Sequence, residues 1–550
     1  MKTLKYTLLI LIAAGISGCD DFLVETPQTD IAKDGVYNSV SSAKSALAGC
    51  YAKMSDYNAF GFNYFHVVNV TSGMSVSIKQ NDVNLTTMNI LPSDVNMTNT
   101  YNGTYEIIRV ANDIIDGMQY STISDEKEKN RIWGEAYFAR AVSYFNLVRL
   151  FGKVSLVTQP VKSYAEAQKP RAAVEDVYAQ IIADLENAWQ LMAEPGKTES
   201  GHPHKYAAKA LLAKVYLTIA GNDENSAYWQ KAYDTAKEVY DAKTYGLVRP
   251  FAKLFGSENK NNAESIFEIQ FSSTVNSGRT TETTFPVGHP LMSNIMTQGK
   301  SWGKTRPTPR AFDQFDPEDP RREVSFVHTS YENIFETNEK KKTILLYPTA
   351  KADGTKKKWT YKQGDSEYPA WKKYYDKGMS AQASNCNFVY YRYADLLLIL
   401  AEAANELGLP EAATYLNEVL DRARDADGNG TIDETTEVYP LAVTSEESID
   451  KGLLRERIFR ERLKEFTGEC DEWYTVRRRG ESHLRKVMEE HNQRVAEWYG
   501  EQGLDPGSVK FVYTYDITDN NVKKNLLLPF PSDEIVRNEN ISQADQNFGY

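Results

Sequence analysis

The sequence predicts a mostly α-helical protein in which helix hairpins support an irregular face of long loops. Three observations lead to this prediction. From about residue 104 onward, apolar residues recur at spacings of three and four, which is the periodicity of one helix face. Glycine or proline stands between consecutive helical segments, where short turns are needed. Long stretches rich in Asn, Thr, Ser, Gly, Pro and aromatic residues separate the helical parts, and loops of such length in a compact protein usually serve a function.

The individual helices can be placed in order along the chain. The periodic apolar residues predict helices at 133–151, 174–193, 208–219 and 229–240, and a hairpin at 392–424 that turns at Gly408. The first two of these helices can pack as a hairpin, and a short turn at Gly221 joins the next two. The hairpins resemble tetratricopeptide units with imperfect periods.

The first 30 residues indicate export and lipid anchoring. Residues 1–18 have the pattern of a signal peptide, and its apolar stretch from Leu8 to Ala14 is too short to span a bilayer. The tetrapeptide from Ile16 to Cys19 resembles a bacterial lipobox, in which the Cys19 thiol receives a diacylglyceryl group. Residues 19–30 then form a lipidated tether, so we expect a chain that is anchored to a membrane without spanning it. The alternative is an ordinary secretory signal with a chance cysteine at its end.

The net charge of the chain indicates which classes of partner to expect. The formal net charge is −12, whereas a sequence-independent grip on phosphate backbones requires an excess of Lys and Arg. Nucleic acid is therefore not an expected partner. The 34 tyrosines exceed what a core needs and are typical of a contact surface.

The carboxylates contain no recognisable acid and base pair. Glycosidase chemistry needs two carboxyl groups that face one another across a bond, and nothing in the sequence selects such a pair. Glu461, Glu465 and Glu469 recur at steps of four. We expect them to pair with the nearby arginines on a helix surface, namely Arg457, Arg460 and Arg462. No catalytic residue is predicted.

Five segments carry motifs that resemble one known family. They are GEAYFARAVSYFNLVRLFGKVSLVTQPV at 134–161, DPEDPRR at 316–322, RYADLLLILAEAANELG at 392–408, an ER-x-x-E…GE…W…R pattern within 458–480, and LLLPFPSDEIVRNENISQADQNFGY at 526–550. Together they resemble the SusD/RagB family of nutrient-uptake outer-membrane lipoproteins. The sequence departs from the family pattern at residues 470–472 and in the segment after Arg424.

The resemblance implies a SusD-like α-helical fold and a binding role without a covalent step. It divides the chain into an N-terminal region at 31–270 with tetratricopeptide-like helices and a C-terminal region at 271–550 with loop insertions. It also implies a lipoprotein of the cell outer membrane that faces the exterior. Such a protein binds a nutrient glycan and delivers it, as a hinged lid, to a SusC-like TonB-dependent transporter. A peptide or another nutrient is the alternative ligand. A pure tetratricopeptide scaffold is a third interpretation, but it needs neither aromatic loops nor a surface lipid.

Two loop regions combine aromatic rings with polar groups, as sugar binding requires. Sugar rings expose apolar C–H faces that stack on aromatic rings, and their hydroxyl groups need polar partners. For any single residue, loop packing or contact with the transporter explains the pattern as well as ligand contact does. The predicted ligand contacts are therefore a set: Phe60, Tyr64, Lys79, Asn81 and Asp82 in the first region, and Trp302, Trp359, Tyr361 and Trp371 in the second.

Residues 425–433 match the start of an EF-hand-type loop. Ca²⁺ requires six to eight oxygen ligands, and oxygen-bearing side chains stand here at alternate positions. Thr436 occupies the twelfth position, where a bidentate Glu is expected, and Glu434 and Glu437 flank it. The alternative is an acidic turn stabilised by Asx turns. No cofactor is required, and the sequence leaves a structural calcium open, with Asp425, Asp427, Asn429, Thr431 and Asp433 as its ligands.

Overall fold

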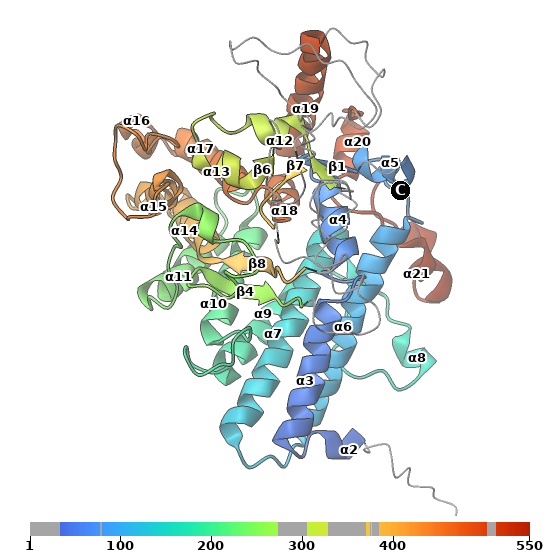
Figure 1. The fold of residues 1–550 in the computed structure, drawn as a ribbon. Helices are drawn as coiled ribbons and strands as arrows, with labels where there is room; N and C mark the ends of the chain where they lie inside the picture. Colours follow the sequence, from blue (N-terminus) through green and yellow to red (C-terminus); the bar gives the residue numbers. More distant parts are fainter. Residues whose placement is uncertain are drawn as a thin grey trace, which may run out of the picture.

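The structure, a computed structural model, describes residues 33–77, 80–272, 305–327, 370–374, 376, 384–502 and 513–550. Within these ranges the chain is mostly helical, and the short strands pair two by two (Figure 1). The predicted fold class is therefore confirmed.

Three long helices near the N-terminus each begin where a serine or aspartate side chain accepts a hydrogen bond from the first turn. Such a cap serves backbone N–H groups that have no partner inside the helix. The helices are α3 (Val40–Met54) after Ser39, α6 (Val95–Gln119) after Asp94 and α7 (Glu126–Phe151) after Asp125. They pack against one another, and shorter helices lie beside them: α2 (Lys33–Val36), α4 (Phe62–Val70), η2 (Gln80–Asp82) and α5 (Val83–Thr86).

The helix hairpins continue from α7 as a row in which each helix packs on the next. The order of contact is α7, α9, α10, α11, α14 and α15. Their bounds are α9 (Val174–Leu191), α10 (Lys205–Ala220), α11 (Tyr228–Asp241), α14 (Tyr393–Leu407) and α15 (Ala412–Arg424), with α8 (Tyr164–Ala167) and η3 (Phe251–Lys253) in the connections. The helices predicted from periodicity coincide with this row. Gly408 ends α14 with φ 71°, a left-handed conformation that glycine adopts without a steric penalty.

The C-terminal part adds helices that pack on the end of this row. α17 contacts α14, and α18 contacts both α17 and α4. The bounds are α12 (Pro309–Asp313), α13 (Pro320–Ser325), α16 (Ser445–Ile449), α17 (Lys451–Glu465), α18 (Glu472–Arg477), α19 (Glu481–Gln502), α20 (Asp519–Lys524), α21 (Ser532–Arg537) and η4 (Gln543–Asp545).

The strands join segments that are far apart in sequence. All four described pairs are antiparallel: β1 (Ser75–Ser77) with β5 (Thr305–Pro307), β2 (Val154–Ser155) with β3 (Arg171–Ala172), β4 (Ser265–Ile269) with β8 (Phe388–Arg392), and β6 (Phe326–Val327) with β7 (Ala370–Trp371). The pair of β4 and β8 fixes the position of Arg392, because β8 ends at this residue and leads directly into α14.

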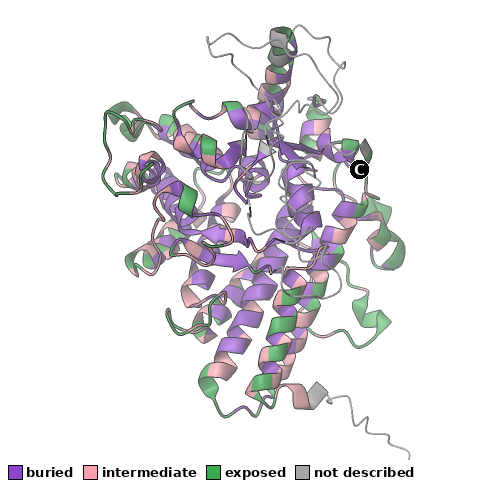
Figure 2. Ribbon diagram, viewed as in Figure 1, coloured by how far each residue is buried: buried purple, intermediate pink, exposed green. Residues whose placement is uncertain are grey.

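The core runs through the whole described chain. Figure 2 shows α4, α7 and the centre of the molecule as mostly buried, and the exposed residues along the outer helices and loops. One cluster of buried apolar side chains extends from Ala43 to Ile541. Among the described residues, no helix combines the length and the apolar character needed to cross a membrane.

The last residues of the chain dock on the end of α7. Leu528 N donates to Leu150 O at 2.8 Å, and Asn547 Nδ2 donates to Phe151 O at 3.0 Å. Arg171 Nη2 donates to both Phe151 O and Asn547 Oδ1. The C-terminal segment thereby covers one side of the end of α7.

Candidate ligand-binding site

Three charged residues of the family motifs form a buried ion-pair network with Glu264 and Arg422, which lie outside those motifs. Arg392 Nη1 donates to Glu465 Oε1 at 2.6 Å and to Glu264 Oε1 at 2.8 Å, and Arg422 Nη1 donates to Glu264 Oε2 at 2.6 Å. Arg321 Nη1 donates to Glu465 Oε2 at 2.9 Å. These five side chains are almost fully buried. They connect α13, β8, α15, α17 and the residue that precedes β4, so their role is structural.

The predicted surface pairing of Glu461, Glu465 and Glu469 is therefore wrong. Glu461, Glu465 and Glu469 are buried, and their partners are Arg321, Arg392 and Lys373. Packing by β8 and α13 covers this side of α17, which helical spacing alone could not reveal. The expected partners make other contacts. Arg457 donates to Leu441 O, and Arg460 pairs with Glu456. Arg462 pairs with Asp395 and Asp471.

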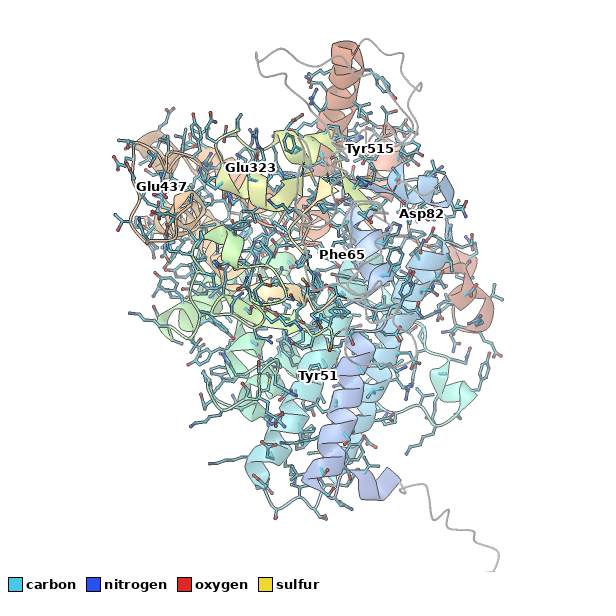
Figure 3. The ribbon with its side chains drawn as sticks, viewed as in Figure 1. Tyr51, Phe65, Asp82, Glu323, Glu437 and Tyr515 are labelled. Carbon is cyan, nitrogen blue, oxygen red and sulfur yellow. The ribbon has the colours of Figure 1, made fainter. Side chains whose placement is uncertain are left out.

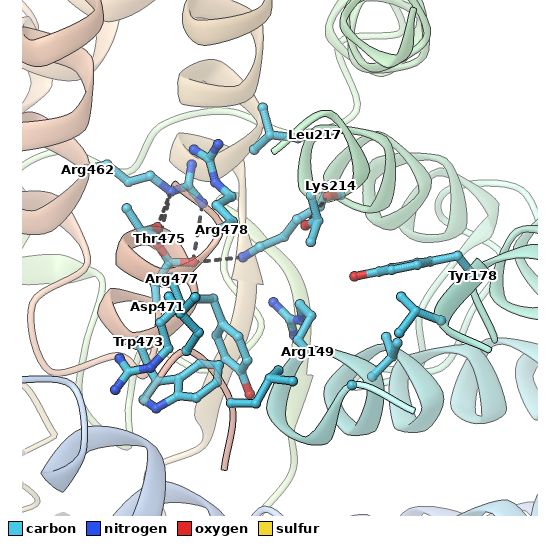
Figure 4. A pocket seen from close by; sticks show the side chains of 17 residues that line it. Arg149, Tyr178, Lys214, Leu217, Arg462, Asp471, Trp473, Thr475, Arg477 and Arg478 are labelled. Carbon is cyan, nitrogen blue, oxygen red and sulfur yellow. Dashed lines mark hydrogen bonds and ion pairs between the residues drawn. The ribbon is translucent and has the colours of Figure 1, made fainter. Parts of the chain in front are cut away.

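A cavity of about 360 Å³ lies where α7, α9, α10, α18 and the C-terminal segment meet (Figure 4). Its volume falls in the range of small-molecule sites, roughly 300–1,000 Å³. Apolar side chains form much of its wall, namely Val148, Val174, Leu217, Leu526 and Leu527, and five cationic residues also line it, namely Arg149, Lys214, Arg462, Arg477 and Arg478.

Arg149 is held rigidly at one side of this cavity. Its guanidinium lies between the rings of Phe145 and Tyr474, 3.7 Å from each centroid. Its Nε donates to Phe145 O at 3.0 Å, and its Nη2 donates to Asn146 Oδ1 at 2.6 Å. No carboxylate forms an ion pair with Arg149 in the described part of the chain. Its charge is thus stacked on aromatic rings but not neutralised.

The other cations around the cavity divide into two groups. Lys214 and Arg462 share Asp395 and Asp471, and Lys214 Nζ lies 3.0 Å from Asp471 Oδ1. Although burial alone would raise the pKa of Asp471, Arg462 and Lys214 hold it well below its usual range. This group is therefore balanced in charge.

The second group carries an excess of positive charge. Arg478 and Arg479 share the single carboxylate of Glu402. Arg477 donates to two carbonyls, Asn525 O at 2.7 Å and Thr71 O at 2.8 Å, and its buried Nη1 has no hydrogen-bond partner. Burial lowers the pKa of Arg477 to about 9, so it still carries its charge at neutral pH. Together with Arg149, these residues make the surroundings of the cavity electropositive.

A second cavity, of about 490 Å³, lies between α12, α17 and α19 and is electrically different. Apart from Arg457, its arginines and lysines pair with carboxylates: Arg310 with Glu490, Lys464 with Asp316, Arg494 with Asp313, and Arg460 and Lys486 with Glu456. We therefore regard the first cavity, with its unbalanced charge, as the stronger candidate for a ligand site.

The first set of predicted ligand residues lies mostly inside the protein. Phe60 and Tyr64 are 2% and 3% exposed, and the Tyr64 hydroxyl lies 3.0 Å from that of Tyr474. Asp82 is buried and accepts hydrogen bonds from His66 Nε2 and Ser77 Oγ, each at 2.9 Å. Asn81 is exposed, and Lys79 lies outside the described residues. The rings of Phe60 and Tyr64 present no face to a ligand in this structure, because Tyr64 lies in the buried helix α4 and Phe60 is buried in the turn before it.

The second set is described only at Trp371. This ring is 3% exposed and stacks on Phe326, with centroids 5.3 Å apart. It too packs in the core. Trp302, Trp359 and Tyr361 lie outside the described residues, as does Cys19. Their roles stay predictions.

The acidic loop after α15 brings together part of the predicted calcium ligands. Carboxylate oxygens of Asp425, Asp427 and Glu437 lie within 4.8 Å of one another. Asp425 also pairs with Arg249 at 2.6 Å, and Asp433 caps a following turn by accepting from Thr435 N. Figure 3 places Glu437 and Asp82 on opposite sides of the molecule, so this loop is separate from the first set of residues.

Features of the alternative turn are present in the same loop. Asn429 N donates to Asp427 Oδ1 at 2.9 Å, and Thr431 N donates to Asn429 Oδ1 at 2.7 Å. These are Asx turns, in which side chains stabilise the loop without a metal ion. The structural calcium therefore stays a prediction.

The electropositive cavity was not predicted from the sequence. Its residues come from five helices and the C-terminal segment, and no local spacing connects Arg149 with Lys214 or Arg477. The one available signal was the occurrence of Arg149 and Arg477 within two of the family motifs.

Similarity to known families extends over most of the chain. The family described as the SusD family matches residues 263–550, which is more than half of the chain. A second family, described as starch-binding and associating with the outer membrane, matches residues 21–217.

Individual relatives agree with these matches. SusD-like protein P2 of Formosa agariphila is 27% identical to this chain, with 100% of both chains covered. A SusD-like protein of Bacteroides ovatus is 27% identical over 49% of this chain and 50% of its own length.

Solved structures share the fold. A SusD homolog from Bacteroides thetaiotaomicron has a TM-score of 0.74 at 21% identity and covers 95% of this chain and 99% of its own. A crystal structure with xylogluco-oligosaccharide has a TM-score of 0.67 at 21% identity and covers 90% of this chain and 98% of its own. The resemblance of the motifs, the arrangement of the helices and the family match agree, and the chain belongs to the SusD family.

Proposed function

We propose that this protein is a surface lipoprotein of the outer membrane that binds a nutrient glycan and passes it to a SusC-like TonB-dependent transporter as its lid. The observation that carries the proposal is the relative with the same fold that was crystallised with xylogluco-oligosaccharide. The family described as starch-binding and associating with the outer membrane supports both the ligand class and the location. Cys19 is the proposed site of lipidation.

The helical row supports a binding role because it forms a rigid body. Buried ion pairs such as Arg392 with Glu465 hold the C-terminal helices to it. Loops inserted between rigid elements can position ligand contacts, and Trp302, Trp359 and Tyr361 are the proposed contacts in those insertions. No group is needed as a nucleophile or acid, since capture and delivery break no bond.

Native affinity electrophoresis tests glycan capture. A soluble form that begins at residue 20 is run through gels that contain single polysaccharides, together with Trp302→Ala and Trp359→Ala variants. We expect retardation in at least one polysaccharide gel and weaker retardation of the tryptophan variants, whose melting temperatures should match that of the parent. Free migration in every gel would contradict glycan capture and would favour the peptide alternative.

Lipidation and the transporter partner need a separate experiment in cells. The full chain is expected in the outer-membrane fraction and to co-purify with a TonB-dependent barrel, whereas Cys19→Ala is expected to be released from the membrane. Retention of the Cys19→Ala variant in the membrane fraction would contradict the lipid anchor. Purification without any barrel would contradict the role as a lid.

A further inference from the structure

Three polar groups point into the apolar-walled cavity near α7 from different helices. Figure 4 shows the Arg149 guanidinium of α7, the Tyr178 hydroxyl of α9 and the Lys214 side chain of α10 directed toward the same space. The Tyr178 hydroxyl and Arg149 Nη1 have no hydrogen-bond partner among the described residues. Lys214 already pairs with Asp395 and Asp471, and the unpartnered Nη1 atoms of Arg462 and Arg477 are buried, so the donors that we assign to a ligand are those of Arg149 and Tyr178.

The protonation states of Tyr178 and Arg149 favour an anionic ligand. Burial raises the pKa of Tyr178 to about 12, so its hydroxyl keeps its proton at neutral pH and can donate. Arg149 is always charged and has no carboxylate partner in the described part of the chain. Arg477 and the pair of Arg478 and Arg479 add positive charge that Glu402 only partly neutralises.

The geometry favours a planar anion on a compact body. The sandwich between Phe145 and Tyr474 fixes the plane of the Arg149 guanidinium. Because its Nε and Nη2 are already bonded, Nη1 can donate to one oxygen of a carboxylate while the Tyr178 hydroxyl donates to the other. The apolar wall formed by Val148, Val174 and Leu217 suits the C–H face of a ring rather than a fully solvated ion.

We propose that this cavity binds an acidic sugar, with the carboxylate against Arg149 and Tyr178 and the ring against the apolar wall. The sugar part rests on the proposed function of glycan capture, whereas the carboxylate part rests on the charges and donors of the cavity. The ligand class is therefore a uronic acid, either as a monosaccharide or as one residue of a glycan.

Binding to the soluble form that begins at residue 20 tests this directly. Isothermal titration calorimetry is performed with galacturonate and glucuronate, with the neutral sugars galactose and glucose, and with galactose 6-sulfate. We expect the uronates to bind, their affinity to fall as the salt concentration rises, and the neutral sugars not to bind. No uronate binding, equal binding of neutral sugars, or binding of the sulfate ester alone would overturn the proposal.

Two kinds of variant assign the binding to the cavity. Tyr178→Phe removes only a hydroxyl that has no partner among the described residues, and we expect it to weaken uronate binding about tenfold through the lost hydrogen bond to a charged group. Tyr228→Phe on α11, which does not line the cavity, is the matched control and should bind like the parent. Unchanged affinity of Tyr178→Phe would contradict the assigned contact.

The second variant fills the cavity. Thr218 lies one turn after Lys214 on α10 and lines the cavity. Thr218→Trp is expected to abolish uronate binding, and Thr218→Ala, which leaves the space open, is expected to retain it. Circular dichroism and melting temperature check that both variants fold. Unchanged uronate binding in both Thr218→Trp and Tyr178→Phe would overturn the proposal.

The test of the acidic-sugar site can fail without the test of glycan capture failing, and the reverse also holds. Retardation in polysaccharide gels without uronate binding would overturn only the acidic-sugar site. Uronate binding that depends on Tyr178, together with free migration in every gel and purification without a barrel, would instead contradict the proposed capture and delivery of a nutrient glycan.

Discussion

At the scale of single residues, buried charges decide where the molecule is rigid. Glu465 accepts hydrogen bonds from Arg321, Arg392 and Arg422, and all four side chains are buried. Although burial alone would raise the pKa of Glu465, these arginines hold it far below the usual range. The stability of each charge in such a network depends on its partners, because removal of one charge leaves the others buried without an opposite charge.

Glu465→Gln should therefore destabilise the protein strongly. Because three guanidinium groups lose their shared carboxylate, we expect the free energy of unfolding to fall by about 3–5 kcal/mol. Urea denaturation followed by circular dichroism measures the change. Glu456→Gln is the matched control on the same helix, since Glu456 pairs with Arg460 and Lys486 near the surface, and its effect should stay within about 1 kcal/mol. Equal effects of the two variants would contradict the structural role of the network.

A second prediction concerns the pH dependence of stability and rests on Glu402. Burial alone would raise its pKa, but Arg478 and Arg479 lower it from 4.5 to about 2. A carboxylate whose pKa is lower in the folded than in the unfolded state stabilises the protein above the unfolded pKa, and this stabilisation is lost as the pH falls through the folded pKa. The stability due to Glu402 should therefore decline between about pH 4.5 and pH 2.

Unfolding free energies measured across this pH range test the prediction. Glu402→Gln should be less stable than the parent at neutral pH and should lose less stability on acidification. Glu186→Gln, at an exposed position of α9, should follow the pH profile of the parent. If the unfolding free energies of Glu402→Gln and the parent fell in parallel as the pH was lowered, Glu402 would not be the cause of the pH dependence.

At the scale of elements, close packing between helices explains a motif glycine. Gly134 lies in α7, and a Cβ atom there would lie 2.8 Å from the backbone nitrogen of Met192 at the end of α9. α7 and α9 can approach this closely only because Gly134 has no side chain. By contrast, a Cβ atom at Gly49 in the exposed part of α3 would meet nothing within 4 Å.

The two glycines predict opposite effects of the same substitution. Alanine favours a helix by about 1 kcal/mol over glycine, so Gly49→Ala should raise the free energy of unfolding by up to about 1 kcal/mol. Gly134→Ala should lower it by about 1–3 kcal/mol, because overpacking against a backbone atom outweighs helix propensity. Thermal and urea denaturation measure both. Stabilisation by Gly134→Ala would show that α9 moves aside without cost.

The loop after α15 is the second element with a testable property. If Asp425, Asp427 and Glu437 hold the structural calcium that the sequence suggests, the melting temperature should rise with millimolar Ca²⁺ and fall with a chelator. Asp427→Asn should remove that dependence. An identical melting temperature in Ca²⁺ and in chelator would leave the loop as an acidic turn, with Arg249 as the partner of Asp425.

At the scale of the whole molecule, the regions 31–270 and 271–550 share one core. β4 ends the first region, yet its partner strand β8 belongs to the second. α11 of the first region packs on α14 of the second, and the C-terminal segment docks on α7. The boundary between the regions therefore follows the chain but does not separate two independent folds.

A fragment of residues 31–270 should therefore fail to fold on its own. It would expose the apolar faces of α10 and α11 that α14 covers, and β4 would lack its partner. We expect weak near-ultraviolet circular dichroism, rapid proteolysis and no cooperative melting, whereas the chain from residue 20 to 550 should melt in one transition. A cooperative transition of the fragment would contradict a shared core.

The class of the fold, the main helices and the family could all be predicted from the order of the residues. Helical periodicity and the glycine and proline turns are local properties, so α7, α9, α10, α11, α14 and α15 were recognisable from neighbouring residues alone. The motifs also identified Glu465, Arg392 and Gly134 as part of a family pattern. Local spacing could not tell what these residues contact.

Which side chains are buried, and which of them meet, depends on how the helices pack. Phe60, Tyr64 and Trp371 have the composition of a sugar-binding surface, but α6, α18 and β6 cover them or pack near them. The cavity that joins Arg149, Tyr178 and Lys214 exists because α7, α9 and α10 pack side by side. Burial and charge balance are sums over residues far apart in the chain, and for this physical reason the electropositive site became visible only in the folded molecule.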